Sequence, residues 1–141
     1  GAIAAVLVVV PEPNPAWLGL MVAWLMAWEI GGQNVPADWN DVEEDRRVGA
    51  RTIPLVFGPR VAGTVVLVAL IATVALSLWL PLMSPLALGW PFRAATLAAG
   101  FFLLFRSLEG RRAAYLFDRA SLYPLAMLVI VTVFVLLESL R

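Results

Sequence analysis

A group of oxygen-bearing side chains between positions 34 and 45 is the part of this sequence best suited to chemistry. Four of them recur at spacings of four, three and four residues: Asn34, Asp38, Asp41 and Asp45. If the segment is one continuous α-helix, the four side chains fall within an arc of about 60° and form a polar stripe. Carboxylates that share a helix face repel one another, so a bound cation would stabilise such a stripe. The spacing therefore predicts a metal site whose candidate ligands are these four residues.

The residue types that are missing narrow the choice of cation. The sequence contains no His and no Cys, which are the usual ligands of zinc and other transition metals. A site built from oxygens favours Mg²⁺ or Ca²⁺, and proteins commonly hold Mg²⁺ with one or two carboxylates while substrate phosphates complete its shell. Arg46, Arg47 and Arg51 follow the acids, and guanidinium groups pair well with phosphate oxygens. These residues predict a metal and diphosphate site; a solvated acidic helix end at the membrane surface is the alternative.

The segment that holds these residues resembles a known family signature. From Asp41 to Gly58 the sequence reads DVEEDRRVGARTIPLVFG, which is similar to the second aspartate-rich signature of the UbiA superfamily of intramembrane prenyltransferases. That signature contains Asp-x-x-x-Asp, a basic residue, a Gly, an Arg/Lys-Thr pair and a short apolar run that ends in Gly. A weaker likeness, LFDRASLY at 116–123, is similar to the pattern that opens the family's last helix. The resemblance covers essentially the whole chain, as the C-terminal half of an expected nine-helix enzyme.

This resemblance implies transfer of a polyprenyl group from its diphosphate to an acceptor, often an aromatic ring, inside the membrane. In the family, Mg²⁺ ions bridge two facing aspartate-rich segments to the diphosphate and stabilise the leaving group. By match to the motif, Asp41 and Asp45 are the candidate catalytic, Mg²⁺-associated pair, and Arg47 and Arg51 are candidates for diphosphate binding. Relatives act in quinone and lipid biosynthesis, so an aromatic or lipid acceptor is expected.

Two features depart from the family pattern. A regular four-residue repeat would place a third acid at Ala37, whereas the acid is Asp38, so its supporting role rests on sharing a helix face with the motif. The first aspartate-rich segment lies outside this sequence, and no residue here is assigned to acceptor binding. The chain begins at Gly1 within an apolar run and is expected to be part of a longer enzyme, inactive alone.

The composition predicts that membrane helices position these side chains. Hydrophobic residues make up 62% of the chain and charged residues 14%, against about 45–50% and about 25% in soluble domains. We expect an all-α, polytopic transmembrane bundle, with residues 1–141 forming part of a single domain and 31–60 an aspartate-rich segment and loop. Since a span takes about 20 apolar residues, four to five spans are predicted: 1–10 (the end of a helix), 16–30, 61–80, 91–105 and 120–137.

The arginines predict how the bundle crosses the membrane. Loops rich in Arg and Lys remain in the cytoplasm, and an alternating path places eight of the ten arginines on one side: Arg46, Arg47, Arg51, Arg60, Arg106, Arg111, Arg112 and Arg119. Arg93 and Arg141 fall on the other side. The aspartate-rich loop is therefore expected in the cytoplasm, with a bacterial cell membrane as the setting. The formal net charge of zero gives no reason to expect nucleic acid; the expected partners are polyprenyl diphosphate, the acceptor and membrane lipids.

Several interpretations remain open from the sequence. Trp24 and Trp28 share a helix face, which fits packing or lipid contact, or else the lining of a prenyl tunnel. Glu29 in an apolar helix fits either a role near the metal or simple exposure at the helix end. The chain as a whole could instead belong to an ion-coupled transporter, or to a non-catalytic scaffold that binds a partner through its acidic block. Transporter sites usually lie near the bilayer midplane, so the boundary position of the acids favours the enzyme.

Overall fold

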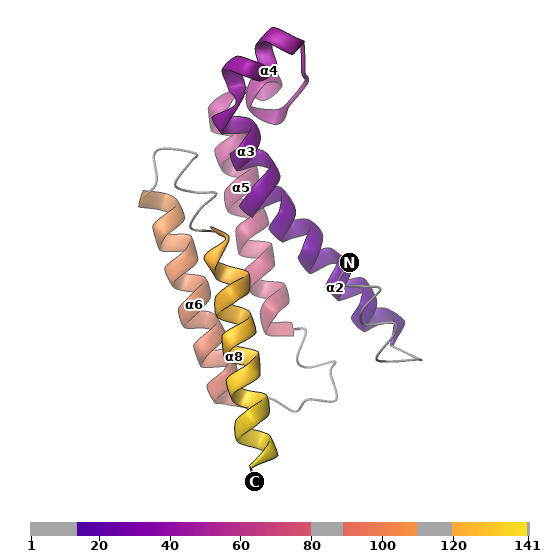
Figure 1. The fold of residues 1–141 in the computed structure, drawn as a ribbon, viewed down its shortest axis with the longest axis vertical. Coiled ribbons are helices and arrows are strands. Elements are labelled where there is room, and N and C mark those ends of the chain that lie inside the picture. Colours follow the sequence, from indigo (N-terminus) through magenta and orange to yellow (C-terminus); the bar gives the residue numbers. More distant parts are fainter. Residues whose placement is uncertain (1–13, 80–88, 110–119, 141) are drawn as a thin grey trace.

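The long helices run in alternating directions through one bundle (Figure 1). The computed structural model describes residues 14–79, 89–109 and 120–140, and every regular element within these ranges is a helix. The four long helices are α2 (Pro15–Trp28), α5 (Ile53–Trp79), α6 (Trp90–Glu109) and α8 (Leu122–Ser139). The prediction of an all-α bundle is therefore confirmed. The predicted helix end at 1–10 lies outside the described residues.

The first long stretch continues well past α2. The chain is helical without interruption from Pro15 to Asn40, through α2, the π-helix η1 (Glu29–Asn34) and α3 (Val35–Asn40). Asn14 caps the start, because its Oδ1 accepts a hydrogen bond from the backbone N–H of Ala16 at 2.9 Å. Pro15 takes the first helical position, where its missing N–H costs no bond. The span predicted at 16–30 is thus the N-terminal part of a longer helical stretch, residues 15–40, which we call the helical limb.

Helix α5 begins earlier than the sequence predicted. The expected span started at Val61, but the helix starts at Ile53 and includes a kink at Gly58. Gly58 has φ 81° and ψ 170°, a conformation that is accessible to glycine because it lacks a Cβ. Pro59 follows directly, so the kink separates a short first turn from the long membrane-crossing part. At 27 residues, α5 is long and apolar enough to cross a membrane by itself.

The last two helices are close to their predictions. The span predicted at 91–105 is observed as α6, which continues to Glu109, and the one predicted at 120–137 as α8, which ends at Ser139. Pro124 lies in the first turn of α8, where a missing backbone N–H breaks no helical hydrogen bond. The apolar parts of these helices, Trp90–Phe105 and Leu122–Leu137, are shorter than α5.

Helix α5 lies at the centre of the packing. It contacts α2, η1, α3 and α6, and α6 contacts α8. Buried residues follow one face of α5 at helical spacing: Ala62, Val66, Ala69, Leu70, Thr73, Val74 and Ser77. Because lipid-facing surfaces need no polar covering, large apolar side chains on the other faces remain exposed, among them Val68 at 60%.

A small polar cluster ties three helices together inside the apolar core. The Ser77 Oγ on α5 accepts hydrogen bonds from Trp24 Nε1 on α2 at 2.6 Å and from Tyr123 Oη on α8 at 3.0 Å. It also donates to the carbonyl oxygen of Thr73 at 2.8 Å. Trp24 stacks on Trp28 with ring centroids 6.5 Å apart. These contacts support packing, one of the two interpretations of the tryptophan pair.

Candidate functional site

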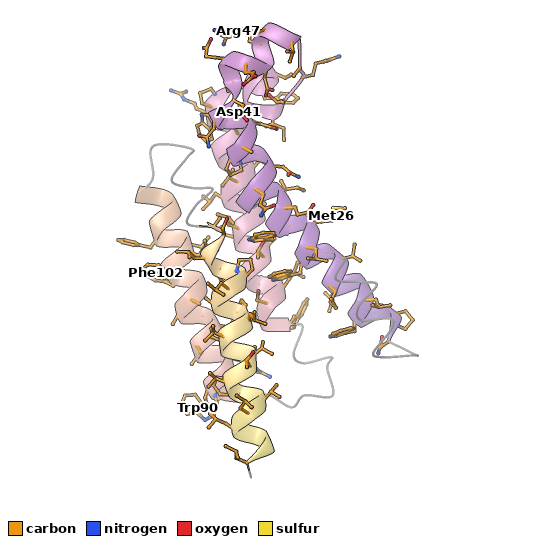
Figure 2. All side chains as sticks on the ribbon, viewed as in Figure 1. Met26, Asp41, Arg47, Trp90 and Phe102 are labelled. Carbon is orange, nitrogen blue, oxygen red and sulfur yellow. The ribbon has the colours of Figure 1, made fainter. Side chains whose placement is uncertain are left out.

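The aspartate-rich segment forms one end of the molecule. It comprises α3, α4 (Val42–Val48) and the turn that leads into α5 (Figure 1). Figure 2 shows Asp41 near the point where the helical limb ends and Arg47 beyond it. The end of α6 and the start of α8 point toward this end of the bundle, whereas the C-terminus lies at the opposite end. The charged segment is therefore displaced from the apolar helices and lies where a membrane surface is expected.

The predicted stripe is not the face of one continuous α-helix. Asn34 closes the π-helix and Asp38 lies in α3, but Asp41 has φ −98° and ψ 12° and interrupts the helix before Asp45 in α4. The backbone remains connected through the break, because the Asp41 N–H donates to the Ala37 carbonyl at 3.1 Å and the Asp45 N–H to the Asp41 carbonyl at 2.9 Å. Asn and Asp compete with helical backbone hydrogen bonds, which is consistent with a break at Asn40–Asp41.

The three carboxylates nevertheless remain close enough to influence one another. The pKa of Asp38 is raised, first by its partial burial and then by repulsion from Asp45 and Asp41. Asn34 is exposed. Within the described ranges, no three acidic side chains gather around a single point at metal-binding distance. The carboxylates of this chain therefore form an open cluster rather than a closed cage.

Asp45 has a carboxylate oxygen that lacks a partner. Its Oδ2 atom is buried and has no hydrogen-bond partner, although Asp45 sits on a helix of charged residues. A buried carboxylate oxygen without a donor or cation is costly. Oxygen donors at Asp45, Asp41 and Asp38 suit a hard cation such as Mg²⁺, so the residues present fit that metal.

The neighbouring arginines differ in what they already bind. Arg46 Nη1 lies 3.2 Å from Glu43 Oε1, in an ion pair whose side chains are 63% and 79% exposed. Arg47 and Arg51 are also exposed, and neither forms an ion pair with another residue of the described ranges. Their guanidinium donors are thus available to an anion, and diphosphate binding by these two residues stays a prediction.

A glycine turn ends α4 and leads the chain through Arg51 to the start of α5. Gly49 ends α4 in the left-handed conformation, with φ 71° and ψ 25°, where a side chain would add strain. The N–H groups of Gly49 and Ala50 both donate to the Asp45 carbonyl, the latter at 2.9 Å. The chain therefore reverses directly after Asp45 and returns Arg51 and Thr52 to the start of α5. The Thr52 Oγ1 is a second buried polar atom without a hydrogen-bond partner.

A pocket beside this turn was not predicted from the sequence. It has a volume of about 310 Å³ and takes its lining from α3, α4 and the first turns of α5: Trp39, Val42, Arg46, Pro54, Leu55 and Pro59. These residues are separated along the chain and meet because α5 folds back on α3. In the sequence, Trp39 stands next to Asp38, but this position alone does not indicate a cavity.

Glu29 lies away from the carboxylate cluster. Its side chain is exposed at the start of η1. The helical limb that separates it from Asp38 spans about 13 Å at a rise of about 1.5 Å per residue. Glu29 is thus exposed and distant from the acids, but it does not lie at a helix end, because the helical stretch continues to Asn40.

Comparison with known families agrees with the sequence resemblance. The sequence model of the UbiA prenyltransferase family matches residues 1–128. The match includes the aspartate-rich segment, all of α5 and α6, and the first turns of α8. A search of curated proteins and a search of solved structures give no match.

Proposed function

Because the chain belongs to the UbiA prenyltransferase family of integral membrane enzymes, we propose that it supplies one aspartate-rich half of a Mg²⁺-dependent site. The reaction is transfer of a polyprenyl group from its diphosphate to an aromatic or lipid acceptor. The observation that carries the proposal is the Asp45 carboxylate, whose Oδ2 is buried without a hydrogen-bond partner. A divalent cation at that oxygen would offset the cost of burial.

Each charged residue has a distinct role in this proposal. Asp41 and Asp45 hold the metal, and Asp38 supports them; its pKa is raised first by burial and then by repulsion from Asp45 and Asp41. Arg47 and Arg51 donate hydrogen bonds to diphosphate oxygens. Mg²⁺, when bound, supplies positive charge that stabilises the diphosphate leaving group. Asn34 supports the acids only as a more distant oxygen donor, since its side chain is exposed.

The reaction requires stabilisation of negative charge at the diphosphate and exclusion of water from the prenyl group. The allylic C–O bond breaks with its electron pair on the diphosphate, a bond forms between the prenyl carbon and the acceptor, and the acceptor loses a proton. The arginines stabilise the negative charge that develops on the leaving group. Val35 and Pro36 are buried directly beneath the acids, so the side of the site that faces the bundle is apolar and excludes water.

The proposal also places the chain within a larger assembly. One aspartate-rich segment occurs in these 141 residues, so the facing segment is contributed by another part of the enzyme. We place the present chain in the C-terminal half, with α4 in the cytoplasm of a bacterial cell. The open carboxylate cluster is consistent with a metal that is shared between two segments.

The test is prenyl transfer by the full-length enzyme in membranes, with Asp41→Asn and Asp45→Asn compared with the natural sequence. Removing either metal-binding carboxylate should lower turnover on the order of 100-fold or more, as for other groups that stabilise transition-state charge. Glu44→Gln is the matched control, because Glu44 is an exposed acid on the same short helix, and it should retain activity.

Protein levels of the variants should stay close to those of the natural sequence. Addition of EDTA should abolish turnover, and Mg²⁺ should restore it. Normal turnover by both Asp variants would overturn the site. Stability that responds to a metal without release of diphosphate would instead indicate an ion-binding function.

A further inference from the structure

The π-helix η1 stands directly before the helix that carries the first acid. The Val35 N–H donates to the Ile30 carbonyl five residues earlier, which is the wider spacing that defines a π-turn. Pro36 follows and has no N–H to donate, and its ring would collide with the carbonyl four residues earlier in a regular α-helix. The wide turn therefore accommodates Pro36 without ending the helical limb. Such turns are often found at functional sites.

Gly31 fixes this turn against the centre of the bundle. A Cβ at Gly31 would lie 2.8 Å from Ala69 Cβ, 3.0 Å from Val66 O and 3.1 Å from Leu70 N. Two of these three atoms belong to the backbone of α5, which cannot move aside as a side chain could. The backbone of η1 thus rests directly on the backbone of α5, and a glycine at this position is required for so close an approach.

Residues after η1 continue the same contact up to the acids. Val35 and Pro36 are buried against α5, and Trp39 lies next to Gly63, where an added Cβ would be 3.7 Å from the indole ring. Each residue of a π-turn rotates less about the axis than a residue of an α-turn. Over the six residues of η1 the difference adds up to about 100°, the rotation of one residue in an α-helix. Helix α3 is therefore turned about its own axis by that angle, compared with an unbroken α-helix. The direction of Asp38 therefore depends on η1.

We infer that Gly31, through the π-turn that it seats on α5, is a positioning residue for the carboxylates of Asp38, Asp41 and Asp45. The inference rests on the proposed function, because it concerns how well these acids meet Mg²⁺. Gly31 touches neither metal nor substrate. Its effect is transmitted along α3, whose buried face is held in place by the same helix α5.

The experiment compares three Gly→Ala variants of the full-length enzyme. Gly31→Ala adds a methyl group that must displace η1 from α5. Gly19→Ala, on α2, adds one where no atom lies within 4 Å. Gly100→Ala, on α6, adds one that collides with the Val74 side chain of α5, so it disturbs a different helix–helix contact, away from the acids. Thermal unfolding, the Mg²⁺ concentration for half-maximal prenyl transfer, and a spin-label distance are measured for each.

The spin labels are attached at Asn40→Cys and Val68→Cys, two exposed positions on α3 and α5. These 141 residues contain no Cys, and any Cys elsewhere in the full-length enzyme is replaced by Ser. Gly31→Ala should change this distance by about 1 Å or more, which is the gap between 2.8 Å and an ordinary carbon contact. It should also raise the half-maximal Mg²⁺ concentration roughly 10- to 100-fold, the range for residues that orient metal ligands. Gly100→Ala should lower the unfolding temperature but change neither the label distance nor the half-maximal Mg²⁺ concentration. Gly19→Ala should change none of these three quantities.

An unchanged label distance in Gly31→Ala, or an unchanged Mg²⁺ requirement despite an altered distance, overturns the inference. If Gly31→Ala does not fold, the double variant with Ala69→Gly removes the nearest colliding atom and is judged by the same two readouts. If the natural enzyme shows no Mg²⁺-dependent transfer, the proposed function fails, while the label distance still decides whether Gly31 sets the direction of α3.

Discussion

Three neighbouring carboxylates in this protein occupy different surroundings. Asp38 is partly buried and has a raised pKa, Asp41 is exposed at a helix break, and Asp45 holds one oxygen buried without a partner. Acids placed this closely destabilise the protein on which they sit unless a cation joins them. The unfavourable arrangement is thus the physical basis for expecting a metal here.

Replacing Asp38 by Asn should stabilise the metal-free protein near neutral pH. Burial, and then repulsion from Asp45 and Asp41, raises the pKa of Asp38 in the folded protein above its ordinary value of 3.8, so folding disfavours its ionised form. That penalty is complete above the folded pKa and absent below 3.8. The gain should be a few tenths of a kcal/mol per like-charged neighbour, and should fade as the pH falls through the folded pKa. Unfolding measured in EDTA across this pH range checks it, with Glu44→Gln as the variant that should show no such gain.

The arginines give a second prediction at the same scale. Arg47→Gln and Arg51→Gln should each raise the KM for polyprenyl diphosphate roughly tenfold or more, because hydrogen bonds to charged groups contribute about 1.5–3 kcal/mol. Arg46 already pairs with Glu43 at 3.2 Å, so Arg46→Gln should have a smaller effect. Steady-state kinetics with varied diphosphate and saturating acceptor distinguish the three variants. Equal effects for all three would contradict separate roles.

The helices owe their arrangement to a few specific contacts. Helix α5 meets η1 through glycine and meets α2 and α8 through the hydroxyl of Ser77. In a membrane, apolar side chains gain little by leaving lipid for each other, so close backbone approach and interhelical hydrogen bonds determine which faces meet. Ser77 satisfies two donors at once and joins helices far apart in the sequence.

Ser77→Ala removes a single oxygen atom, but it should lower the free energy of unfolding more than the loss of one exposed hydroxyl would. The change leaves Trp24 Nε1 and Tyr123 Oη without their shared acceptor, and the expected loss is about 1–2 kcal/mol. Thr64→Ala is the matched control, since the Thr64 hydroxyl bonds only to the Arg60 carbonyl within the same helix. Unfolding in detergent micelles provides the comparison. In a double-mutant cycle, Tyr123→Phe should add less in the Ser77→Ala background than alone.

The molecule as a whole separates a charged end from an apolar body. Figure 2 shows Met26 and Phe102 on the outside of the bundle, and these side chains are 57% and 62% exposed. Exposed tryptophans lie at the last residue of α5, Trp79, and at the first residue of α6, Trp90. Figure 2 shows Trp90 at the opposite end of the bundle from Arg47. Tryptophan favours membrane–water interfaces, so the described helices have the distribution of an integral membrane protein, with the acids beyond one surface.

This arrangement predicts opposite labelling of the two ends. Asn40→Cys on α3 and Leu140→Cys after α8 introduce single thiols into a chain without Cys, at opposite ends of the bundle (Figure 1). In sealed inverted vesicles, a membrane-impermeant maleimide should label Cys at position 40 and spare position 140. In intact spheroplasts the pattern should reverse. Labelling of both positions from one side would contradict the alternating path.

The sequence by itself determined the class of the molecule and the residues of its charged end. Apolar stretches of span length are a local property, so the helices at 91–105 and 120–137 were predicted to within a few residues, whereas the helical stretch predicted at 16–30 continues to Asn40. The aspartate-rich motif and the arginines at 47 and 51 that follow it were likewise readable, because residue type and short spacing carry that information. The role of these residues in metal and diphosphate binding stays a prediction.

Only the tertiary structure decided how the acids are presented. A uniform spacing predicted one continuous stripe, but packing of η1 on α5 widened one turn, and the helix broke at Asp41. The buried oxygen of Asp45, the pocket beside Trp39 and the polar cluster at Ser77 depend on contacts between residues distant in sequence. Such contacts follow from which helix faces meet in space, and helical periodicity within one segment contains no information about its partner.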